Sequence, residues 1–369
     1  MTIVDSGRTE QDGESRALQE RVDALGEEHA QCPFAGDAVA DARDARTDGM
    51  LALVEPDRVP SGYPAAGSVA VCALVPVKNE QANIVECLRR LRWCEQITVI
   101  DSQSGDDTIP LAQAMGGEVY QFHYDRSVGW PKKKNWALEH VPWRHEWILI
   151  VDADEHITPE LAREIESVIL KGTTPHKPGC GDGYWLNRRF MFLGRWLKYG
   201  GWYPSLNLRL FKHRVGRYER IGTLGDTGSG DNEVHEHPVL LTGEAGYLEH
   251  DMEHYAYPNL SVWIEKHNRY TTWEAHAQDA KDEGGVKPRL FGGSIQRRRW
   301  LKKHARGLPG RPVIRFVFDY IARRGILDGY AGFVMAMNMA WYEFRSDAKR
   351  DEMKIAERSE QGSTTKGER

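Results

Sequence analysis

Short apolar runs alternate with amphipathic segments between residues 69 and 151, and this alternation constrains the fold more than any other feature of the chain. A continuous apolar run such as Val69–Val77 is typical of a strand buried on both faces, as in a parallel sheet. Strands and helices that alternate at short intervals indicate βαβ units with right-handed crossovers. We therefore predict an α/β fold with a twisted sheet, strands over 69–77, 97–101, 118–122 and 147–151, and helices over 83–93, 107–115 and 133–141.

Polar side chains follow three of these predicted strands. Asn79 and Glu80 come after the first strand and Asp101 ends the second, while Asp152 and Asp154, separated by one residue, follow the fourth. In open α/β sheets, ligands bind outside the carboxyl ends of the strands. Residues 152 and 154 share one side of an extended chain, so the repulsion between their carboxylates indicates a cation between them. Hard divalent ions prefer oxygen ligands and phosphates, which predicts a metal-bound nucleoside diphosphate; the alternative is a strand-end turn, where Asp is common.

Missing motifs argue against several other enzyme classes. The first strand–helix unit contains neither G-x-G-x-x-G nor G-x-x-x-x-G-K-[ST], which disfavours a dinucleotide dehydrogenase and a P-loop enzyme. His235, His237, His250 and His254 raise the alternative of a zinc site, but the H-E-x-x-H pattern of zinc hydrolases does not occur. Pro238 also argues against a helix that continues through this region.

Charge is distributed unevenly along the 369 residues. The net charge of −5 argues against a generally basic nucleic-acid binder. Residues 1–60 carry 14 acidic and 6 basic side chains, and we predict a disordered acidic extension over 1–66. Residues 287–324 instead carry 12 basic side chains and one acidic side chain, and a basic segment of this kind attracts anionic lipid or phosphate. The alternative for the basic segment is an ordinary solvated helix face.

Aromatic and apolar side chains accompany this basic segment: Phe316, Phe318, Tyr320, Phe333, Met335 and Trp341. The combination predicts a helical region over 276–346 that lies at a membrane interface. Packing of these apolar residues onto the preceding domain or onto a second subunit is the alternative. The charged residues 347–369 are predicted to form a disordered tail.

Further expectations concern the cellular compartment. Five scattered cysteines without a C-x-x-C pair predict a reducing compartment and no disulfide framework. The first residues lack the pattern of a signal peptide. The charge-free stretch 329–342 is too short for the roughly 20 residues of a spanning helix. We therefore expect a protein that is soluble or lies on a membrane surface.

Four sequence segments together resemble a family 2 glycosyltransferase with the nucleotide-diphospho-sugar transferase fold called GT-A. They are V-P-V-K-N-E at 75–80, V-I-D-S-Q-S-G-D-D-T at 99–108, K-K-K-N-W-A-L at 132–138 and V-D-A-D-E at 151–155. Later segments resemble a subgroup that acts in lipopolysaccharide-core and cell-surface glycan assembly: N-L-R-L-F-K at 207–212, V-H-E at 234–236, H-Y-A-Y at 254–257 and K-H-N-R-Y at 266–270.

The resemblance implies a Rossmann-like GT-A catalytic domain over 67–275, with helices on both faces of its sheet, followed by the helical membrane-associating region. It implies an inverting transfer of a sugar from a nucleotide-diphospho-sugar, with a UDP-sugar expected, to a hydroxyl of a lipid-linked or lipopolysaccharide-type glycan acceptor. Mg²⁺ or Mn²⁺ is the implied cofactor. The implied location is the inner face of the bacterial cytoplasmic membrane, with no nucleic-acid partner.

The resemblance also implies roles for individual residues. Asp154 is the expected direct metal ligand, Asp152 is expected near the ribose and the metal, and His254 is a candidate to complete the metal shell unless it is a core histidine. Nucleotide-sugar contacts are expected from Pro76, Asn79, Glu80, Asp101, Lys132, Lys134, Asp152 and Arg209. Asp101 has a strand-end turn as its alternative role, and the two lysines have simple solvation as theirs.

A general base is needed because the acceptor hydroxyl loses a proton as the new bond forms. Glu236 is the predicted base, with Glu233 and Asp231 as rivals, and pairing of Glu236 with Arg209 as another possibility. Aromatic residues crowd the region where the acceptor is expected, and stacking on sugar and filling of a core are equally good interpretations of Trp185, Trp196, Tyr199, Trp202 and Tyr203.

Two alternative functions differ from sugar transfer. A sugar-1-phosphate nucleotidyltransferase shares the sheet arrangement, but it requires a glycine-rich basic loop after the first strand, where this chain has Lys78, Asn79 and Glu80. A non-catalytic membrane-surface scaffold with the same fold is the other alternative.

Overall fold

The computed structural model describes residues 59–123, 132–171, 173–174, 177–178, 181–218, 238–257, 259–279 and 310–364. The expected acidic extension therefore lies almost entirely outside the described residues, as do the predicted base Glu236 and its rivals Glu233 and Asp231. All described residues belong to one compact unit, Arg43–Arg369.

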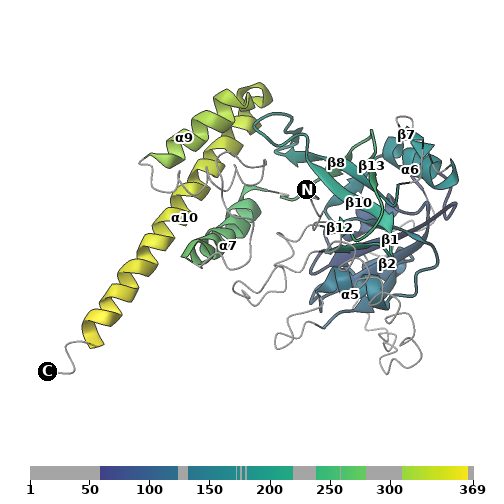
Figure 1. Ribbon diagram of the computed structural model, residues 1–369, viewed down its shortest axis with the longest axis horizontal. Helices are drawn as coiled ribbons and strands as arrows, with labels where there is room; N and C mark the ends of the chain where they lie inside the picture. Colours follow the sequence, from purple (N-terminus) through teal and green to yellow (C-terminus); the bar gives the residue numbers. More distant parts are fainter. Residues whose placement is uncertain are drawn as a thin grey trace, which may run out of the picture. The chain divides into compact units, whose positions relative to one another are not determined.

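The first half of the domain forms a parallel sheet (Figure 1). Its strands β1 (Val69–Val77), β2 (Cys94–Asp101), β3 (Glu118–Gln121) and β4 (Trp147–Ile150) lie in the order β3-β2-β1-β4. Helices α3 (Ile84–Arg89), α4 (Thr108–Ala114) and α5 (Lys133–His140) connect them. Each strand and helix predicted between residues 69 and 151 is confirmed, with ends that differ by a few residues.

The alternating side chains of β1 divide the core into two layers. Val71, Ala73 and Val75 pack in the layer that contains α3, α4 and α6 (Pro159–Lys171). Cys72 and Leu74 pack on the opposite face with α5. All five side chains are fully buried, as expected for a central strand. The predicted α/β class, with helices on both faces of the sheet, is therefore confirmed.

A mainly antiparallel extension continues the sheet beyond β4, and the sequence did not indicate it. Strand β10 (Leu206–Lys212) runs antiparallel to β4 and β8 (Gly183–Phe192), and β14 (Met252–His254) joins β8 to β5 (Glu155–Ile157). The remaining strands are β6 (Thr173–Thr174), β7 (Lys177–Pro178), β9 (Arg195–Trp196), β11 (Gly216–Tyr218), β12 (Pro238–Leu240) and β13 (Ala245–Tyr247). The pairing of β14 with β5 brings residue 254 beside the segment that carries the two aspartates, because His254 pairs with Glu155.

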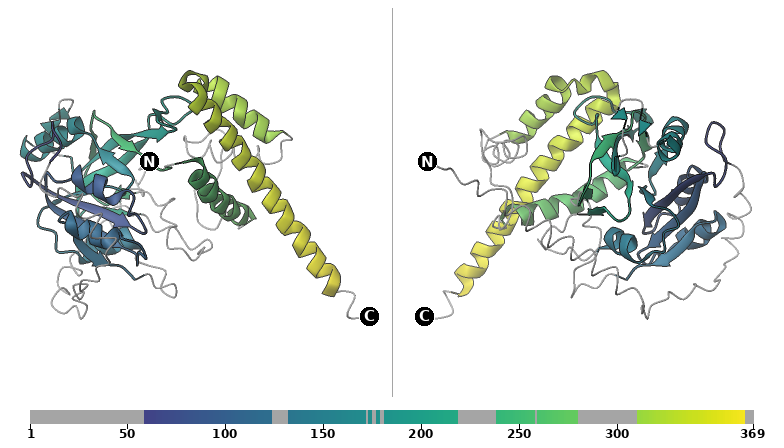
Figure 2. Two further views of the ribbon diagram at one scale, coloured as in Figure 1. Left: turned by 180° about the vertical axis from the view of Figure 1, so that it is seen from behind. Right: turned by 45° about the vertical axis from the view of Figure 1, so that its right-hand side comes forward.

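A third core cluster joins the end of β8 to the C-terminal helices. It contains Phe190 and Phe192 of β8, Trp263 of α7 (Leu260–Asp279) and Met335 of α10 (Gly329–Thr364). Helix α9 (Arg311–Val317), the π-helical turn η2 (Phe318–Ala322) and the 3₁₀ turn η3 (Gly325–Asp328) precede α10, and α9 lies along α10 in Figures 1 and 2. Part of the C-terminal region thus packs onto the preceding domain.

The prediction of a disordered tail after residue 347 is wrong for residues 347–364, because α10 continues without a break to Thr364. This segment is rich in residues with high helix propensity, such as Ala348, Lys349 and Met353. Opposite charges three residues apart add support, as in the ion pair between Arg350 and Asp347 at 3.5 Å. Among the helices that the structure describes, we find none with the length and apolar character needed to cross a bilayer.

Candidate functional site

The loops after β1 and β2 are bonded to each other at the carboxyl edge of the sheet. The backbone N–H of Asn79 donates to Ser104 Oγ, and Asn79 Oδ1 accepts the N–H of Gly105, both at 2.8 Å. Asn79 adopts a positive φ of 55°, a conformation that asparagine tolerates better than most residues. Glu80 donates its backbone N–H to Thr108 Oγ1 at 2.8 Å. These bonds fix the two loops in a common rim, with the predicted residues Asn79 and Glu80 on it.

Asp101 lies at the end of β2 and is fully buried. Its carboxylate accepts bonds from the backbone N–H and hydroxyl of Ser104 and from Gln121 Nε2 at 3.0 Å. These contacts are those of a strand-end turn, the alternative role for this residue. The structure therefore gives Asp101 a demonstrated part in closing the loop after β2, while its nucleotide contact stays a prediction.

Asp152 is held by two cationic side chains. Its Oδ1 lies 3.1 Å from Lys134 Nζ, and its Oδ2 accepts a bond of 2.6 Å from the guanidinium of Arg209. The same guanidinium donates at 2.6 Å to Glu155, which is fully buried and also lies 3.1 Å from Arg188. Burial by itself raises the pKa of Asp152, but Arg209 and Lys134 together hold it well below its ordinary value. Asp152 is therefore ionised and fixed in position.

Asp154 faces His254, which the antiparallel extension delivers from a strand one hundred residues later in the chain. His254 Nε2 lies 3.6 Å from Asp154 Oδ1, and the backbone N–H of Tyr255 donates to the carbonyl of Asp154 at 2.8 Å. Burial raises the pKa of Asp154, but His254 and, to a smaller extent, Lys266 lower it, and the pKa is lowered overall. Two predicted metal-binding residues are thus brought together.

The donor set of this site fits a divalent cation that is shared with a bound phosphate. Among the residues that the structure describes, no three His, Cys, Asp or Glu side chains are grouped as ligands for a metal ion. Mg²⁺ is commonly held by only one or two protein carboxylates together with substrate phosphates and water. Asp154 supplies one such carboxylate and His254 lies beside it, whereas both carboxylate oxygens of Asp152 already contact cationic side chains.

Lys266 of α7 is a residue of the site that we did not predict as a ligand. Its Nζ lies 3.5 Å from the carbonyl of Ala256 and 5.6 Å from the centre of the Tyr257 ring. The pKa of Glu80 is raised mainly by burial and also by Asp154 and Asp152, and Lys266 acts in the opposite direction. The segments that follow β1 and β4 are therefore close enough to each other and to α7 for their charged groups to interact. The signal for Lys266 in the sequence was its place in the K-H-N-R-Y segment.

The structure also gives positions for Pro76, Lys132 and one of the aromatic residues. Pro76 is buried in β1, and Lys132 immediately precedes α5, where its carbonyl accepts the N–H of Trp136. Among the aromatic residues, Trp202 stacks on Phe190 with ring centres 4.6 Å apart in the third core cluster, which favours the core interpretation for Trp202.

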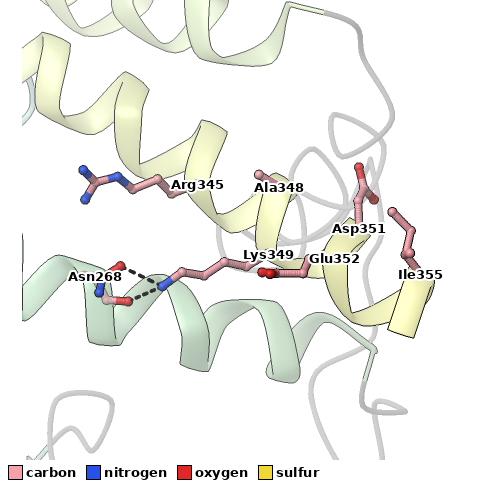
Figure 3. Close-up of a pocket in the computed structure, with 7 residues that line it drawn as sticks. All are labelled: Asn268, Arg345, Ala348, Lys349, Asp351, Glu352 and Ile355. Carbon is pink, nitrogen blue, oxygen red and sulfur yellow. Dashed lines mark hydrogen bonds between the residues drawn. The ribbon is translucent and has the colours of Figure 1, made fainter. Parts of the chain in front are cut away.

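A groove of about 660 Å³ lies between α7 and α10 (Figure 3). Lys349 crosses it and donates to the backbone carbonyl and the side chain of Asn268, at 2.6 and 2.9 Å. The residues that line this groove include none of the predicted site residues. It is a contact between two helices of the C-terminal region and has no part in the site described above.

Comparison with known proteins shows which proteins the chain resembles. Residues 72–227 match the model of the family described as Glycosyl transferase family 2. A lipopolysaccharide core biosynthesis glycosyltransferase, LpsC, of Rhizobium meliloti is 27% identical over 281 residues, which cover 75% of this chain and 90% of that protein. An uncharacterized glycosyltransferase of Rickettsia typhi, RT0209, is 23% identical over 294 residues, which cover 78% of this chain and 89% of that protein.

Solved structures give weaker likenesses. Glucosyl-3-phosphoglycerate synthase from Mycobacterium tuberculosis, in complex with Mn²⁺, UDP and glucosyl-3-phosphoglycerate, is 14% identical and has a TM-score of 0.33, with 67% of this chain and 90% of that chain covered. Mannosyl-3-phosphoglycerate synthase from Rubrobacter xylanophilus is 17% identical and has a TM-score of 0.34, with 61% and 78% covered. Likenesses at this level support no conclusion about the reaction.

The match over 72–227 begins within β1 and contains β2 to β4, the loops after β1 and β2, and both aspartates of the site. A mixed α/β sheet carries these segments. The curated relatives, which extend over three quarters of the chain, are themselves named glycosyltransferases. Residues 72–227, which carry the site, therefore match the glycosyltransferase family 2 model, and three quarters of the chain is similar to proteins named glycosyltransferases.

Proposed function

We propose that this glycosyltransferase moves a sugar, with inversion, from a nucleotide-diphospho-sugar to a hydroxyl of a lipid-linked or lipopolysaccharide-type glycan. One observation carries the proposal: Asp152 and Asp154 follow β4 in direct contact with Lys134, Arg209 and His254. Cationic side chains can bind a nucleoside diphosphate, and the fixed carboxylates beside them can bind its metal counter-ion. The carboxyl edge of the sheet is where ligands of open α/β folds bind.

The side chains of the site have complementary tasks in this reaction. Lys134 and Lys266 provide positive charge for the diphosphate, which gains charge as it leaves the sugar. Asp154 and His254 would hold Mg²⁺ or Mn²⁺, and the ion would supply further charge stabilisation to the leaving group without a proton transfer. Arg209 acts through Asp152 and Glu155, which it keeps in position.

The nucleoside of the donor, which we take to be uridine, is assigned to the rim formed by the loops after β1 and β2. Pro76, Asn79 and Glu80 come from the first of these strands, and Asp101 comes from the second. The bonds between the two loops support this assignment because they hold polar groups at a fixed separation before any ligand binds.

The acceptor assignment rests on the named relative and on the C-terminal region. The Rhizobium protein is named for lipopolysaccharide core biosynthesis, which supports a glycan acceptor that is anchored in lipid. Such an acceptor would be met at the inner face of the bacterial cytoplasmic membrane. The basic residues of 287–324 support this location because anionic lipids attract them.

Isothermal titration with UDP, in the presence and absence of Mn²⁺, tests the proposed function. We expect UDP to bind and Mn²⁺ to increase its affinity, because the ion would be shared between Asp154 and the diphosphate. A protein that binds UDP in neither condition would contradict the proposal and favour a scaffold. Binding of a nucleoside triphosphate with release of pyrophosphate would instead identify a nucleotidyltransferase.

Replacing Glu236 by glutamine should lower kcat by about 10²- to 10⁴-fold, because a positioned general base contributes this much to proton removal. The affinity for UDP should stay unchanged, since the amide preserves size and the donor does not need the base. Transfer rates and UDP titration measure the two effects separately. Glu233→Gln is the matched control and should retain activity; an equal loss in that variant, or loss of UDP binding in Glu236→Gln, would remove Glu236 from the role of base.

Replacing Lys266 by methionine should weaken donor binding by about 10- to 100-fold, the effect of losing one hydrogen bond to a charged group. Lys212→Met is the matched control, because Lys212 pairs with Glu146 and Asp182 and ends β10 on the amino side of β4. The KM for the sugar nucleotide provides the measurement. Equal KM values for the two variants would show that Lys266 does not contact the donor.

A further inference from the structure

Apolar side chains are exposed on α9, on the turns η2 and η3, and at the start of α10. We call this set the apolar rim, and its members are 47–75% exposed: Val313, Ile314, Val317, Phe318, Ile321, Ile326, Leu327 and Tyr330. Five of them recur on α9 and η2 at the spacing of one helical face. A contiguous exposed apolar surface of this kind marks a place of contact with another molecule or with a membrane.

We call α9, η2, η3 and the start of α10 the hairpin. Other faces of α9 and η2 make the contacts that hold α9 against α10. Phe316 and Tyr320 pack against Phe333 of α10, with ring centres 5.9 and 5.7 Å away. Arg311 pairs with Glu343 and Asp347 on α10, and Arg315 pairs with the buried Asp319. These folding and polar contacts lie on other faces of the helix; within the rim, the centre of the Phe318 ring lies 4.6 Å from the guanidinium of Arg323, and all members of the rim remain exposed.

Basic residues accompany the rim in the sequence. Arg323 and Arg324 are exposed at the turn that ends η2. The segment 287–309, directly before α9, carries eight basic residues and no acidic residue. Apolar side chains bordered by arginine and lysine are the composition of elements that lie in the plane of an anionic bilayer surface. This charge favours anionic lipid over a second copy of the chain, which would bring the same positive charges together.

The hairpin is also bonded to the loop beside the proposed site. The carboxylate of Asp328 accepts the backbone N–H groups of Lys198 and Tyr199 at 3.1 and 2.8 Å, and the N–H of Gly200 donates to the carbonyl of Arg323 at 3.0 Å. Trp202 of the same loop stacks on Phe190. The ring of Phe190 in turn meets the His254 ring edge-on, with centres 5.6 Å apart. A short series of contacts thus links the rim to His254.

We propose that the apolar rim inserts into the headgroup region of a membrane that contains anionic lipid and that the hairpin thereby holds the site at the membrane surface. The inference deepens the proposed function and rests on it for the lipid-linked acceptor. Membrane binding itself depends only on the rim and its charges, so it can be measured apart from sugar transfer.

Co-sedimentation of the full chain with phosphatidylcholine vesicles, with and without phosphatidylglycerol, tests the proposal. We expect binding to the vesicles that contain phosphatidylglycerol, and we expect added salt to weaken it. The triple variant Val317→Ser, Ile321→Ser, Leu327→Ser should bind at least about tenfold less, because interfacial binding scales with buried apolar area. The control Leu170→Ser, Leu241→Ser, Tyr247→Ser changes exposed apolar residues outside the rim and should bind like the unmodified chain.

Two further measurements separate the possible failures. Hydrogen exchange of the unmodified chain should slow over residues 311–330 when the anionic vesicles are added, and this needs no variant. The rate of donor hydrolysis without vesicles should be the same for the triple variant and the unmodified chain. If neither protein hydrolysed the donor, that result would count against the proposed function alone.

No binding to anionic vesicles, or equal binding by the triple variant, would overturn the inference. A dimer that the triple variant abolishes while vesicle binding persists would assign the rim to a second copy instead.

Discussion

Replacing Asp154 by alanine is expected to reduce sugar transfer by at least about 1,000-fold while the fold stays intact. The carboxylate is a ligand for the divalent ion in the proposed function, and charge stabilisation by such an ion is worth several kcal/mol in the transition state. A loss of about 4 kcal/mol corresponds to a factor of about 1,000 in rate. The fold should survive because the Asp154 side chain contacts His254 but is not part of the buried group around Arg209.

A matched control for this variant is Glu146→Ala, at the opposite end of β4. Glu146 precedes the strand, is more than half exposed and pairs with Lys212. It should keep full activity. Transfer rates, circular dichroism and the effect of Mn²⁺ on UDP affinity are to be measured for both variants. Near-full turnover by Asp154→Ala would show that this carboxylate does not hold the ion.

Replacing Arg209 by methionine should lower the free energy of unfolding by about 3–5 kcal/mol, the usual cost of breaking a buried ion pair from one side. The substitution keeps an unbranched side chain but leaves the fully buried Glu155 with Arg188 as its remaining cationic neighbour. Denaturant unfolding measures the change. Arg144→Met is the control, because the Arg144 side chain is 59% exposed and pairs at the surface with Glu118, where such pairs are worth about 1 kcal/mol or less.

A second substitution shows whether the loss comes from the unpaired charge. The double variant Arg209→Met, Glu155→Gln should lose less stability than the sum of the two single changes, because it removes both members of the pair. The stability gap between wild type and Arg209→Met should also shrink as the pH falls below about 4. The pKa of Asp152 is lowered in the folded protein, so its pairing stabilises the fold above the ordinary carboxyl pKa and is lost as the carboxylate protonates. A loss below 1 kcal/mol, or strictly additive effects, would contradict this account.

The parallel half of the sheet followed from the sequence because its signals are local. A buried strand such as β1 is a continuous apolar run, and each helix that follows has its own apolar spacing. The mainly antiparallel half of the sheet could not be predicted from the sequence. Strands such as β14 are three residues long, and their pairing with β5 and β8 depends on contacts between segments that lie far apart in the chain.

The same distinction applies to the site. Asp152 and Asp154 could be singled out because they follow a recognisable strand and stand one residue apart. The pairing of Glu155 with both Arg209 and Arg188 was missed, because the partners are separated by more than thirty residues and nothing local marks them. Asp101 shows the reverse case: its position was predicted correctly, but its carboxylate is occupied by contacts within its own loop.

The most direct test of the site is a crystal structure of the protein with UDP and Mn²⁺, with the ion located by its anomalous scattering. We expect one manganese ion that is coordinated by Asp154 and by the diphosphate, next to His254 and within the reach of Lys134. UDP that is bound elsewhere, or a carboxyl edge that holds neither ion nor nucleotide at saturating concentrations, would contradict the assignment of these residues to the sugar donor.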